Sequence, residues 1–328
     1  MSTRLLQVPK LGIYPLYPAL PPWLAMIAGK VWHVKPSSGS DSNSGRQPHT
    51  AFKTLPAALD AATANRNDVV QMYGEGNAAA SCTDYQSEML DWNKDLVHLI
   101  GVGSGVSMSP RARIAPISTY AAAPPTMTVS ANGCYLANLS IWMGVADVTP
   151  LGALKVTGSR NLFERCHIVG MGQAANDVAG AYSLLLSGAE ECEFHGCVIG
   201  SNRVALGAAA NSEILCAAVA KNILFRKCRI KLMTVHGTNT LFLRAAAGSL
   251  DGDLEFEDCA FVNAVHRTGG AALTYGFSVA SNAGGDVILS GLTGVMATDV
   301  NATDAANVYG VGGIVTAATF GLGVALLK

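Results

Sequence analysis

The sequence has few charged residues and almost no net charge. Charged side chains make up 14% of the 328 residues, and 22 basic residues nearly balance 23 acidic ones, which leaves a formal charge of -1. Proteins that bind nucleic acid carry a basic excess on the binding surface, so this composition argues against a nucleic-acid partner. Disorder is excluded for most of the chain, because half of the residues are apolar and can form a core.

Long hydrophobic runs are also missing. The best candidate, LGIYPLYPALPPWLAMIAG (11–29), is interrupted by Pro15, Pro18, Pro21 and Pro22. A membrane-spanning helix needs roughly 20 uninterrupted apolar residues, so we expect no membrane partner. The run also fails as an export signal, and synthesis in the cytoplasm with reduced thiols follows as the expectation. Residues 1–30 are predicted to form an extended arm.

The sequence lacks the short motifs of metal and phosphate sites. Its histidines have no HxxxH or HExxH spacing, so we expect them at the surface or in loops. The loop SGSDSNSG (38–45) lacks the closing Glu of an EF-hand, and an Asx-type turn is the simpler interpretation for Asp41. We therefore expect neither a cofactor nor a metal. The seven histidines are His33, His49, His98, His167, His195, His236 and His266.

A 31-residue repeat organises the middle of the chain. Four segments superimpose: NLFERCHIVG (161–170), ECEFHGCVIG (191–200), NILFRKCRIK (222–231) and DLEFEDCAFV (253–262). Phenylalanine recurs at one position and cysteine three residues later, at Phe163, Phe194, Phe225 and Phe256 and at Cys166, Cys197, Cys228 and Cys259. Several coincident columns at one period indicate a repeat architecture.

The repeat predicts strands rather than helices. A second short apolar run, such as ALKV (153–156) or SLLL (183–186), lies between the copies, so each unit holds at least two strands. No unit contains the roughly 10 to 15 residue amphipathic stretch of a crossover helix. We predict an all-β parallel solenoid in which like residues of successive turns stack about 4.8 Å apart. The Phe and Cys columns form its core ladder, with reduced thiols.

The same register decides how ECEFHGCVIG is interpreted. Taken alone, Cys192, His195 and Cys197 could be half of a zinc site. Cys192 shares its column with Ile223 and Leu254, so both thiols are predicted to face the core as small hydrophobic groups, whereas His195 faces outward. A shared metal would need all three on one side, which argues against zinc.

The segment before the repeats resembles the opening of pectin-lyase-like right-handed parallel β-helix proteins. It reads VWHVKPSSGSDSNSGRQPHTAFKTLPAALDAA, then DVVQMYGEG and VHLIGVGSG. The resemblance covers residues 31 to about 105, and the repeats extend it towards 300. It implies a right-handed parallel β-helix whose open end is covered by a short capping helix at 54–64. The matching residues are Trp32, Val34, Pro36, Gly39, Asp41, Phe52, Lys53, Thr54, Ala57, Ala58 and Ala61.

These features divide the chain into four parts. Residues 1–30 are the arm, 31–105 the cap and first turns, and 106–300 the body with the 31-residue repeats. Residues 301–328 are apolar and rich in Gly and Ala, so they are predicted to pack on the last turn or on a neighbouring subunit.

The resemblance also implies a possible chemistry. Enzymes of this family often cleave acidic polysaccharides by β-elimination, with carboxylates holding Ca²⁺ and a Lys or Arg taking the proton. Strand alternation sends Glu255 and Glu257 outward, so a solvated face is the favoured interpretation of the densest acidic segment and no catalytic residue is assigned. If the protein is an enzyme, the candidates are Asp251, Asp253, Glu255, Glu257, Lys227 and Arg229.

The resemblance, the arm and the apolar C-terminus together are similar to a non-enzymatic component of a bacteriophage virion. A head decoration or cement protein, or a fibre or spike subunit, fits this combination, acting as a homotrimer on a capsid or tail protein. The arm residues expected to bury in a partner's groove are Tyr14, Tyr17, Trp23, Leu24 and Ile27. Two alternatives stay open: a polysaccharide lyase or depolymerase, and an adhesin that binds a host surface glycan.

Overall fold

A computed structural model of the chain describes residues 29–76, 82–103, 106–120, 124–149, 151–266, 269–302 and 307–310, together with the backbone of 325–326. The predicted arm and most of the predicted C-terminal segment lie outside the described residues. Within these ranges no helix has both the length and the apolar character to cross a membrane.

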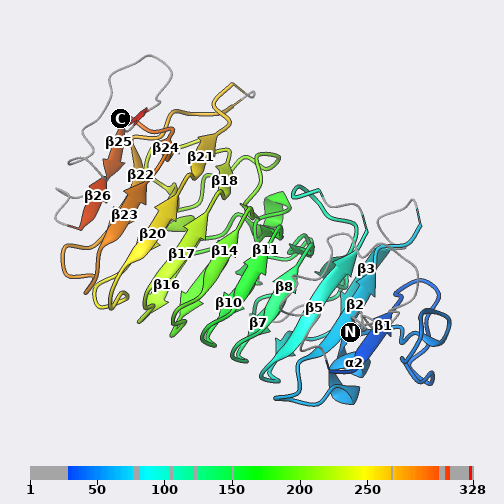
Figure 1. Cartoon of the computed structure of the whole chain (residues 1–328). Coiled ribbons are helices and arrows are strands. Elements are labelled where there is room, and N and C mark those ends of the chain that lie inside the picture. Colours follow the sequence, from blue (N-terminus) through cyan, green and yellow to red (C-terminus); the bar gives the residue numbers. More distant parts are fainter. Residues whose placement is uncertain are drawn as a thin grey trace, which may run out of the picture.

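Short strands coil into three long sheets that run the length of the molecule (Figure 1). Sheet A contains β1 (Val31–Val34), β2 (Asp68–Tyr73), β5 (Val97–Val102), β8 (Tyr135–Ala137), β11 (Leu162–Glu164), β14 (Glu193–His195), β17 (Ile223–Arg226), β20 (Leu254–Glu257), β23 (Val287–Ser290) and β26 (Val308–Gly310). Sheet B contains β3 (Thr83–Gln86), β6 (Arg113–Pro116), β9 (Ser140–Trp142), β12 (His167–Val169), β15 (Val198–Ile199), β18 (Arg229–Leu232), β21 (Ala260–Asn263), β24 (Gly294–Val295) and β27 (Ala325–Leu326). Sheet C contains β4 (Leu90–Trp92), β7 (Met127–Val129), β10 (Gly152–Val156), β13 (Tyr182–Ser187), β16 (Asn211–Ala218), β19 (Thr240–Ala245), β22 (Tyr275–Val279) and β25 (Asp299–Asn301).

Each full turn contributes one strand to each sheet, and the strands pair in parallel with the equivalent strands of the turns before and after. Phe163 of β11, for example, pairs with Phe194 of β14, and Ile168 of β12 pairs with Ile199 of β15. The exception is β27, which pairs antiparallel with β24 at the C-terminal end. The predicted fold class, an all-β parallel β-helix, is confirmed.

The ten-residue repeat motif spans two strands joined by a tight turn. Phe163 lies on β11 of sheet A and Ile168 on β12 of sheet B, with Cys166 between them. Each turn of the coil therefore has three strands, whereas the sequence analysis predicted at least two. Strands of sheet B are as short as Val198–Ile199 in β15, and so short a run shows no alternation.

The turn from sheet A to sheet B places the residue before each cysteine of the column, or before the leucine that replaces it in two turns, in the left-handed backbone region. Glycine adopts this conformation without strain, whereas other residues occupy it at a cost of about 1 kcal/mol or more. The position has no fixed residue type, and Asn138 is buried there, where its side-chain amide donates to the Gly101 carbonyl at 2.8 Å. The positions are Asn138 (φ 56°), Arg165 (50°), Gly196 (60°), Lys227 (54°), Asp258 (54°) and Gly291 (62°).

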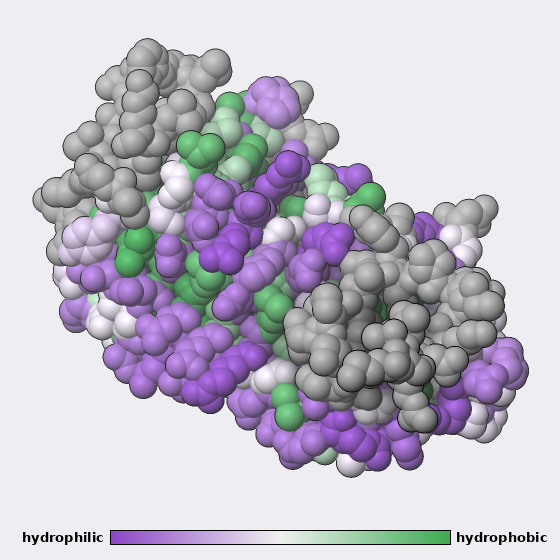
Figure 2. All heavy atoms as spheres, viewed as in Figure 1, coloured by the Kyte–Doolittle hydropathy of each residue, from purple (hydrophilic) through white to green (hydrophobic). Residues whose placement is uncertain are grey.

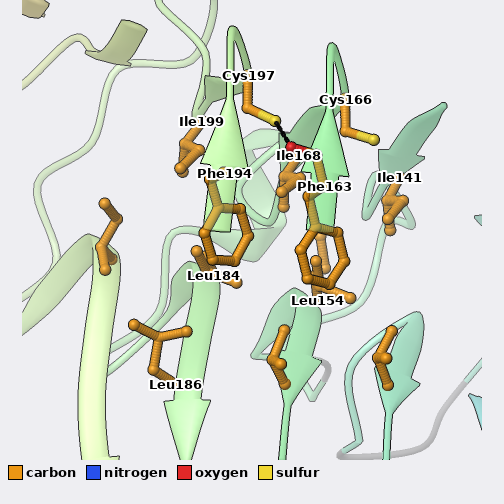
Figure 3. Packing of buried hydrophobic residues seen from close by; sticks show 14 of the residues in the cluster. Ile141, Leu154, Phe163, Cys166, Ile168, Leu184, Leu186, Phe194, Cys197 and Ile199 are labelled. Atoms are coloured by element: carbon orange, nitrogen blue, oxygen red, sulfur yellow. Dashed lines mark hydrogen bonds between the residues drawn. The ribbon is translucent and has the colours of Figure 1, made fainter. Parts of the chain in front are cut away.

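The phenylalanine and cysteine columns form the centre of the core. The rings of Phe163, Phe194, Phe225 and Phe256 stack with centroids 4.6 to 4.7 Å apart and planes within 13° of parallel. Each cysteine thiol after the first donates to the carbonyl of the phenylalanine one turn earlier, as Cys197 Sγ does to the Phe163 oxygen at 3.5 Å (Figure 3). Cys166 donates instead to the Leu136 carbonyl at 3.6 Å.

Helix α2 (Leu55–Ala61) covers the first turn, and it is shorter than the predicted 54–64. The Thr54 hydroxyl accepts from the Ala57 N–H, as expected of an N-cap. The ammonium of Lys94 bonds the carbonyls of Leu59, Asp60 and Ala62 and so ends the helix.

Two carboxylates hold the entry to α2. Asp41 accepts from the backbone N–H groups of Lys53 and Thr54 at 2.8 and 2.9 Å, so the polar loop positions the helix. Asp84 lies inside the end of the solenoid and accepts from the Leu55 N–H at 2.8 Å. Burial raises the pKa of Asp84 to about 6, against the opposing hydrogen bonds from Leu55 and Gln86.

We expect the thiols of Cys166, Cys197, Cys228 and Cys259 to resist labelling in the folded protein. All four are buried, and burial raises the pKa of the Cys166 and Cys197 thiols far above 9, which removes the reactive thiolate. Mass spectrometry after a brief pulse with a thiol reagent would locate the label, with urea-unfolded protein as the control. Rapid labelling of these four sites under native conditions would contradict the register.

Candidate functional site

The structure places the four acidic and two basic candidate residues on different surfaces. Asp251 and Asp253 flank Gly252 in the turn from sheet C to sheet A, and Glu255 and Glu257 point outward from β20. Lys227 occupies the left-handed turn position, and Arg229 lies on the outer side of β18 in sheet B. The carboxylates and the two cations therefore do not face one common space.

Most of these carboxylates bond to a neighbouring turn. Asp251 pairs with Lys221 at 2.8 Å, and Glu257 pairs with the guanidinium of Arg226 at 2.6 Å. Glu255 accepts from the Ser290 hydroxyl at 2.8 Å. On the face shown in Figure 2 hydrophilic side chains predominate, with hydrophobic ones scattered among them. Among the described residues no group of three His, Cys, Asp or Glu side chains could hold a metal ion.

A hollow lies on the outer side of sheet B, and we call it the sheet B hollow. It is lined by Ser109, Trp142, His167, Ser201, Arg203 and Lys231, together with Met108, Gly200 and Asn202. The segment 106–112 crosses over the sheet to reach it, so that Met108 touches the Lys231 ammonium 123 residues later in the chain, at 3.8 Å. Residues from four successive turns, starting with β9, thus meet around one space.

His167 fastens the crossing segment to the sheet. Its Nδ1 accepts from the Ser109 N–H at 3.1 Å, so the proton of the neutral ring lies on Nε2, which donates to the Gly200 carbonyl at 3.2 Å. Burial lowers the pKa of His167 to about 4, and the charges of Lys231, Arg203 and Arg113 act in the same direction. At neutral pH, His167 is therefore an uncharged residue that links the crossing segment to the sheet through hydrogen bonds.

The expectation that the histidines lie at the surface or in loops is wrong for His98 and His167. His98 is 1% exposed and His167 is 4% exposed. The Nδ1 of His98 accepts from the Tyr135 N–H at 3.0 Å, and burial lowers its pKa to about 4. Both residues follow strand alternation and point out of the coil, but other segments cover them, and local sequence gave no signal of that cover.

A buried carboxyl group lies behind the sheet B hollow. Glu213 of β16 is 1% exposed, and its Oε2 accepts from the Ser183 hydroxyl at 2.5 Å. Ser183 Oγ in turn accepts from the Gly170 N–H at 3.0 Å. A Cβ atom at Gly200 would lie 2.3 Å from the Glu213 carboxyl, so only glycine fits between Glu213 and the hollow.

Burial raises the pKa of Glu213 to about 8, although the Ser183 hydrogen bond opposes the shift. The folded protein therefore holds Glu213 mainly as the neutral acid at pH 7. It is the described carboxyl group with the largest upward shift, and the sequence analysis did not single it out, because NSEILCAA (211–218) reads as an ordinary strand with an outward glutamate.

Comparison with known proteins gives distant similarities only. Neither the scan against protein-family models nor the search of curated proteins finds a match. Among solved structures, a pectate lyase is 11% identical over 86% of this chain and 74% of its own, with a TM-score of 0.49. The pectin methylesterase PemA from Erwinia chrysanthemi is 15% identical over 85% of this chain and 80% of its own, with a TM-score of 0.46.

A phage protein is also similar. The ORF18 protein of Geobacillus virus E2 is 11% identical over 85% of this chain and 61% of its own, with a TM-score of 0.36. At these distances none of the three assigns an activity or a ligand to this chain. The fold stands on the strand pairing itself. The chain is a parallel β-helix protein.

We expect Glu213 to make stability fall as pH rises. The unfolded chain ionises Glu213 near its ordinary pKa of 4.5 and the folded chain only near 8, so stability is lost between these values. The loss is on the order of 3 to 5 kcal/mol. Glu213→Gln does not lose this stability, because glutamine does not ionise. The urea midpoint of the variant minus that of the parent should therefore rise between pH 5 and pH about 8.5.

The matched control is Glu257→Gln, which changes a partly exposed carboxylate of the neighbouring sheet. This variant measures how far the loss of one surface carboxylate by itself changes the pH dependence. A Glu213→Gln difference from the parent that stays constant over the same pH range would show that Glu213 is ionised in the folded protein.

Proposed function

We propose that the protein is a non-enzymatic structural component of a bacteriophage particle, a β-helical head decoration or cement protein or a fibre or spike subunit. The observation that supports this best is the use of the surface carboxylates. Asp251, Glu255 and Glu257, which a polysaccharide-cleaving site would need, bond to neighbouring turns instead. These carboxylates therefore link successive turns of the solenoid to one another.

The body is suited to holding a fixed length. Backbone hydrogen bonds between turns run along the axis in all three sheets, and the ring stack of Phe163 to Phe256 fills the centre at the same spacing. Bending would open bonds on one side and compress packed rings on the other, so the coil resists it. A rigid spacer of this kind is what a particle component needs.

The remaining part of the proposal rests on the sequence alone. The arm, residues 1–30, combines prolines with Tyr14, Tyr17 and Trp23, and extended segments of this composition dock into grooves of partner proteins. We propose that the arm anchors the solenoid to a capsid or tail protein and that the solenoid assembles as a homotrimer in the virion.

We expect deletion of residues 1–30 to leave the solenoid folded and to abolish its incorporation into particles. Circular dichroism and the urea midpoint should stay close to those of the full chain, because the first strand of the solenoid begins at Val31 and, among the described contacts, the deletion removes only backbone hydrogen bonds of Gly29 and Lys30. Co-sedimentation with purified particles should fall to background. Replacing Tyr14, Tyr17 and Trp23 by serine in the full chain is the matched variant. A truncated protein that loses its β-sheet signal would show that the arm belongs to the core.

Polysaccharide cleavage is the competing function, and it follows from the resemblance to pectin-lyase-like proteins. We expect no unsaturated sugar product when the protein is incubated with acidic glycans and Ca²⁺ and followed by ultraviolet absorbance. A product that Arg229→Gln abolishes and Lys155→Gln preserves would establish a lyase and refute the structural role. Binding on a glycan array without turnover would favour the adhesin.

A further inference from the structure

The outer side of sheet B carries cations and, from β3 to β24, no carboxylate. Outward positions alternate with the core residues Ile114, Ile141, Ile168, Ile199 and Ile230. The outward charged residues are Arg113, Arg229 and Lys231. The outer side of sheet A differs, because its outward positions include Glu164, Glu193, Glu255 and Glu257 beside Arg226.

Two cations line the sheet B hollow, and a third, Arg113, lies beside it on the Trp142 ring. Arg203 enters from the loop after β15, and Lys231 lies one turn beyond it. The guanidinium of Arg113 lies 4.9 Å from the centre of the Trp142 ring, and its Nε is buried without a hydrogen-bond partner among the described residues. No described carboxylate lies within ion-pair distance of Arg113, Arg203 or Lys231.

This arrangement is repulsive while the hollow holds only protein groups. Burial lowers the pKa of Lys231, and the neighbouring charge of Arg229 lowers it further. The charges of Lys231, Arg203 and Arg113 also oppose protonation of His167, so this ring stays neutral beside them. An anion between these groups would remove the repulsion and complete their hydrogen bonds.

We propose that the sheet B hollow binds an oxyanion group, the carboxylate, sulfate or phosphate of a ligand. Lys231 and Arg203 supply charge-assisted hydrogen bonds, and the Ser201 hydroxyl, which accepts from the Arg203 N–H at 3.3 Å, keeps its own proton to donate. His167 does not touch the anion, because its one proton is committed to Gly200. It holds Ser109 and the crossing segment in place.

The surroundings give room for the rest of such a ligand. Met108 and Val106 of the crossing segment are 44% and 48% exposed beside the hollow, and Tyr85 at the N-terminal end of the same sheet is 49% exposed. An anionic group in the hollow with an apolar or sugar portion over these side chains would use both features.

Isothermal titration of the full chain with two probes tests the site. Inorganic phosphate and glucuronate are titrated separately at constant ionic strength, with chloride as the balancing anion so that general screening stays the same. Saturable binding of at least one probe is expected, and the tighter one shows whether the site takes a tetrahedral or a planar oxyanion. Lys231→Gln and Arg203→Gln should each weaken the binding roughly tenfold or more.

The matched control is Lys155→Gln, which removes an outward strand cation from β10 of sheet C. It should bind the probes as the parent does. Circular dichroism verifies that all three variants are folded. The melting temperature provides a second readout, since the tighter-binding probe should raise it in the parent and in Lys155→Gln but not in Lys231→Gln. The proposal is overturned if neither probe saturates, or if Lys155→Gln weakens binding as much as the two hollow variants do.

Discussion

The parallel hydrogen-bonded register between successive turns governs this structure. Because strands pair in register, each inward residue lies directly over its equivalent one turn away, about 4.8 Å distant. That spacing suits stacked, nearly parallel aromatic rings such as those of Phe163 and Phe194, whose centroids lie 4.6 Å apart. Like side chains therefore form columns, and the 31-residue period of the sequence corresponds to one turn of the coil.

The same register also determines which charged side chains form ion pairs, because outward residues of successive turns lie side by side. An outward carboxylate meets whatever the next turn presents, so Glu257 meets Arg226, and Asp251 meets Lys221. Exposed pairs of this kind contribute little energy each, but they hold surface charge in order along the body. Sheet B departs from this balance, since its cations have no acidic equivalent on adjacent turns. This excess of cations is the reason that we propose an oxyanion as the ligand of the sheet B hollow.

Two buried titratable groups, Glu213 and His167, lie where loops cover the outer side of the sheets. Glu213 lies under the loops between sheets B and C, and His167 lies under the segment 106–112. Their pKa values shift in opposite directions, towards about 8 and about 4, because burial disfavours the charged form of each. Both groups are therefore neutral near pH 7, and the cations around them determine the local charge.

Columns such as Phe163 to Phe256 were predictable from the sequence, because equivalent residues of each repeat occupy equivalent positions in successive turns. The same argument turned Cys192 and Cys197 from a candidate zinc site into core residues, and both are buried. The third strand of each turn was not predictable, since two residues such as Val198 and Ile199 show no alternation. Tertiary structure alone decided the cover over His167 and Glu213 and the meeting of Arg113, Arg203 and Lys231. These depend on contacts between residues up to about 120 positions apart, which no local pattern encodes.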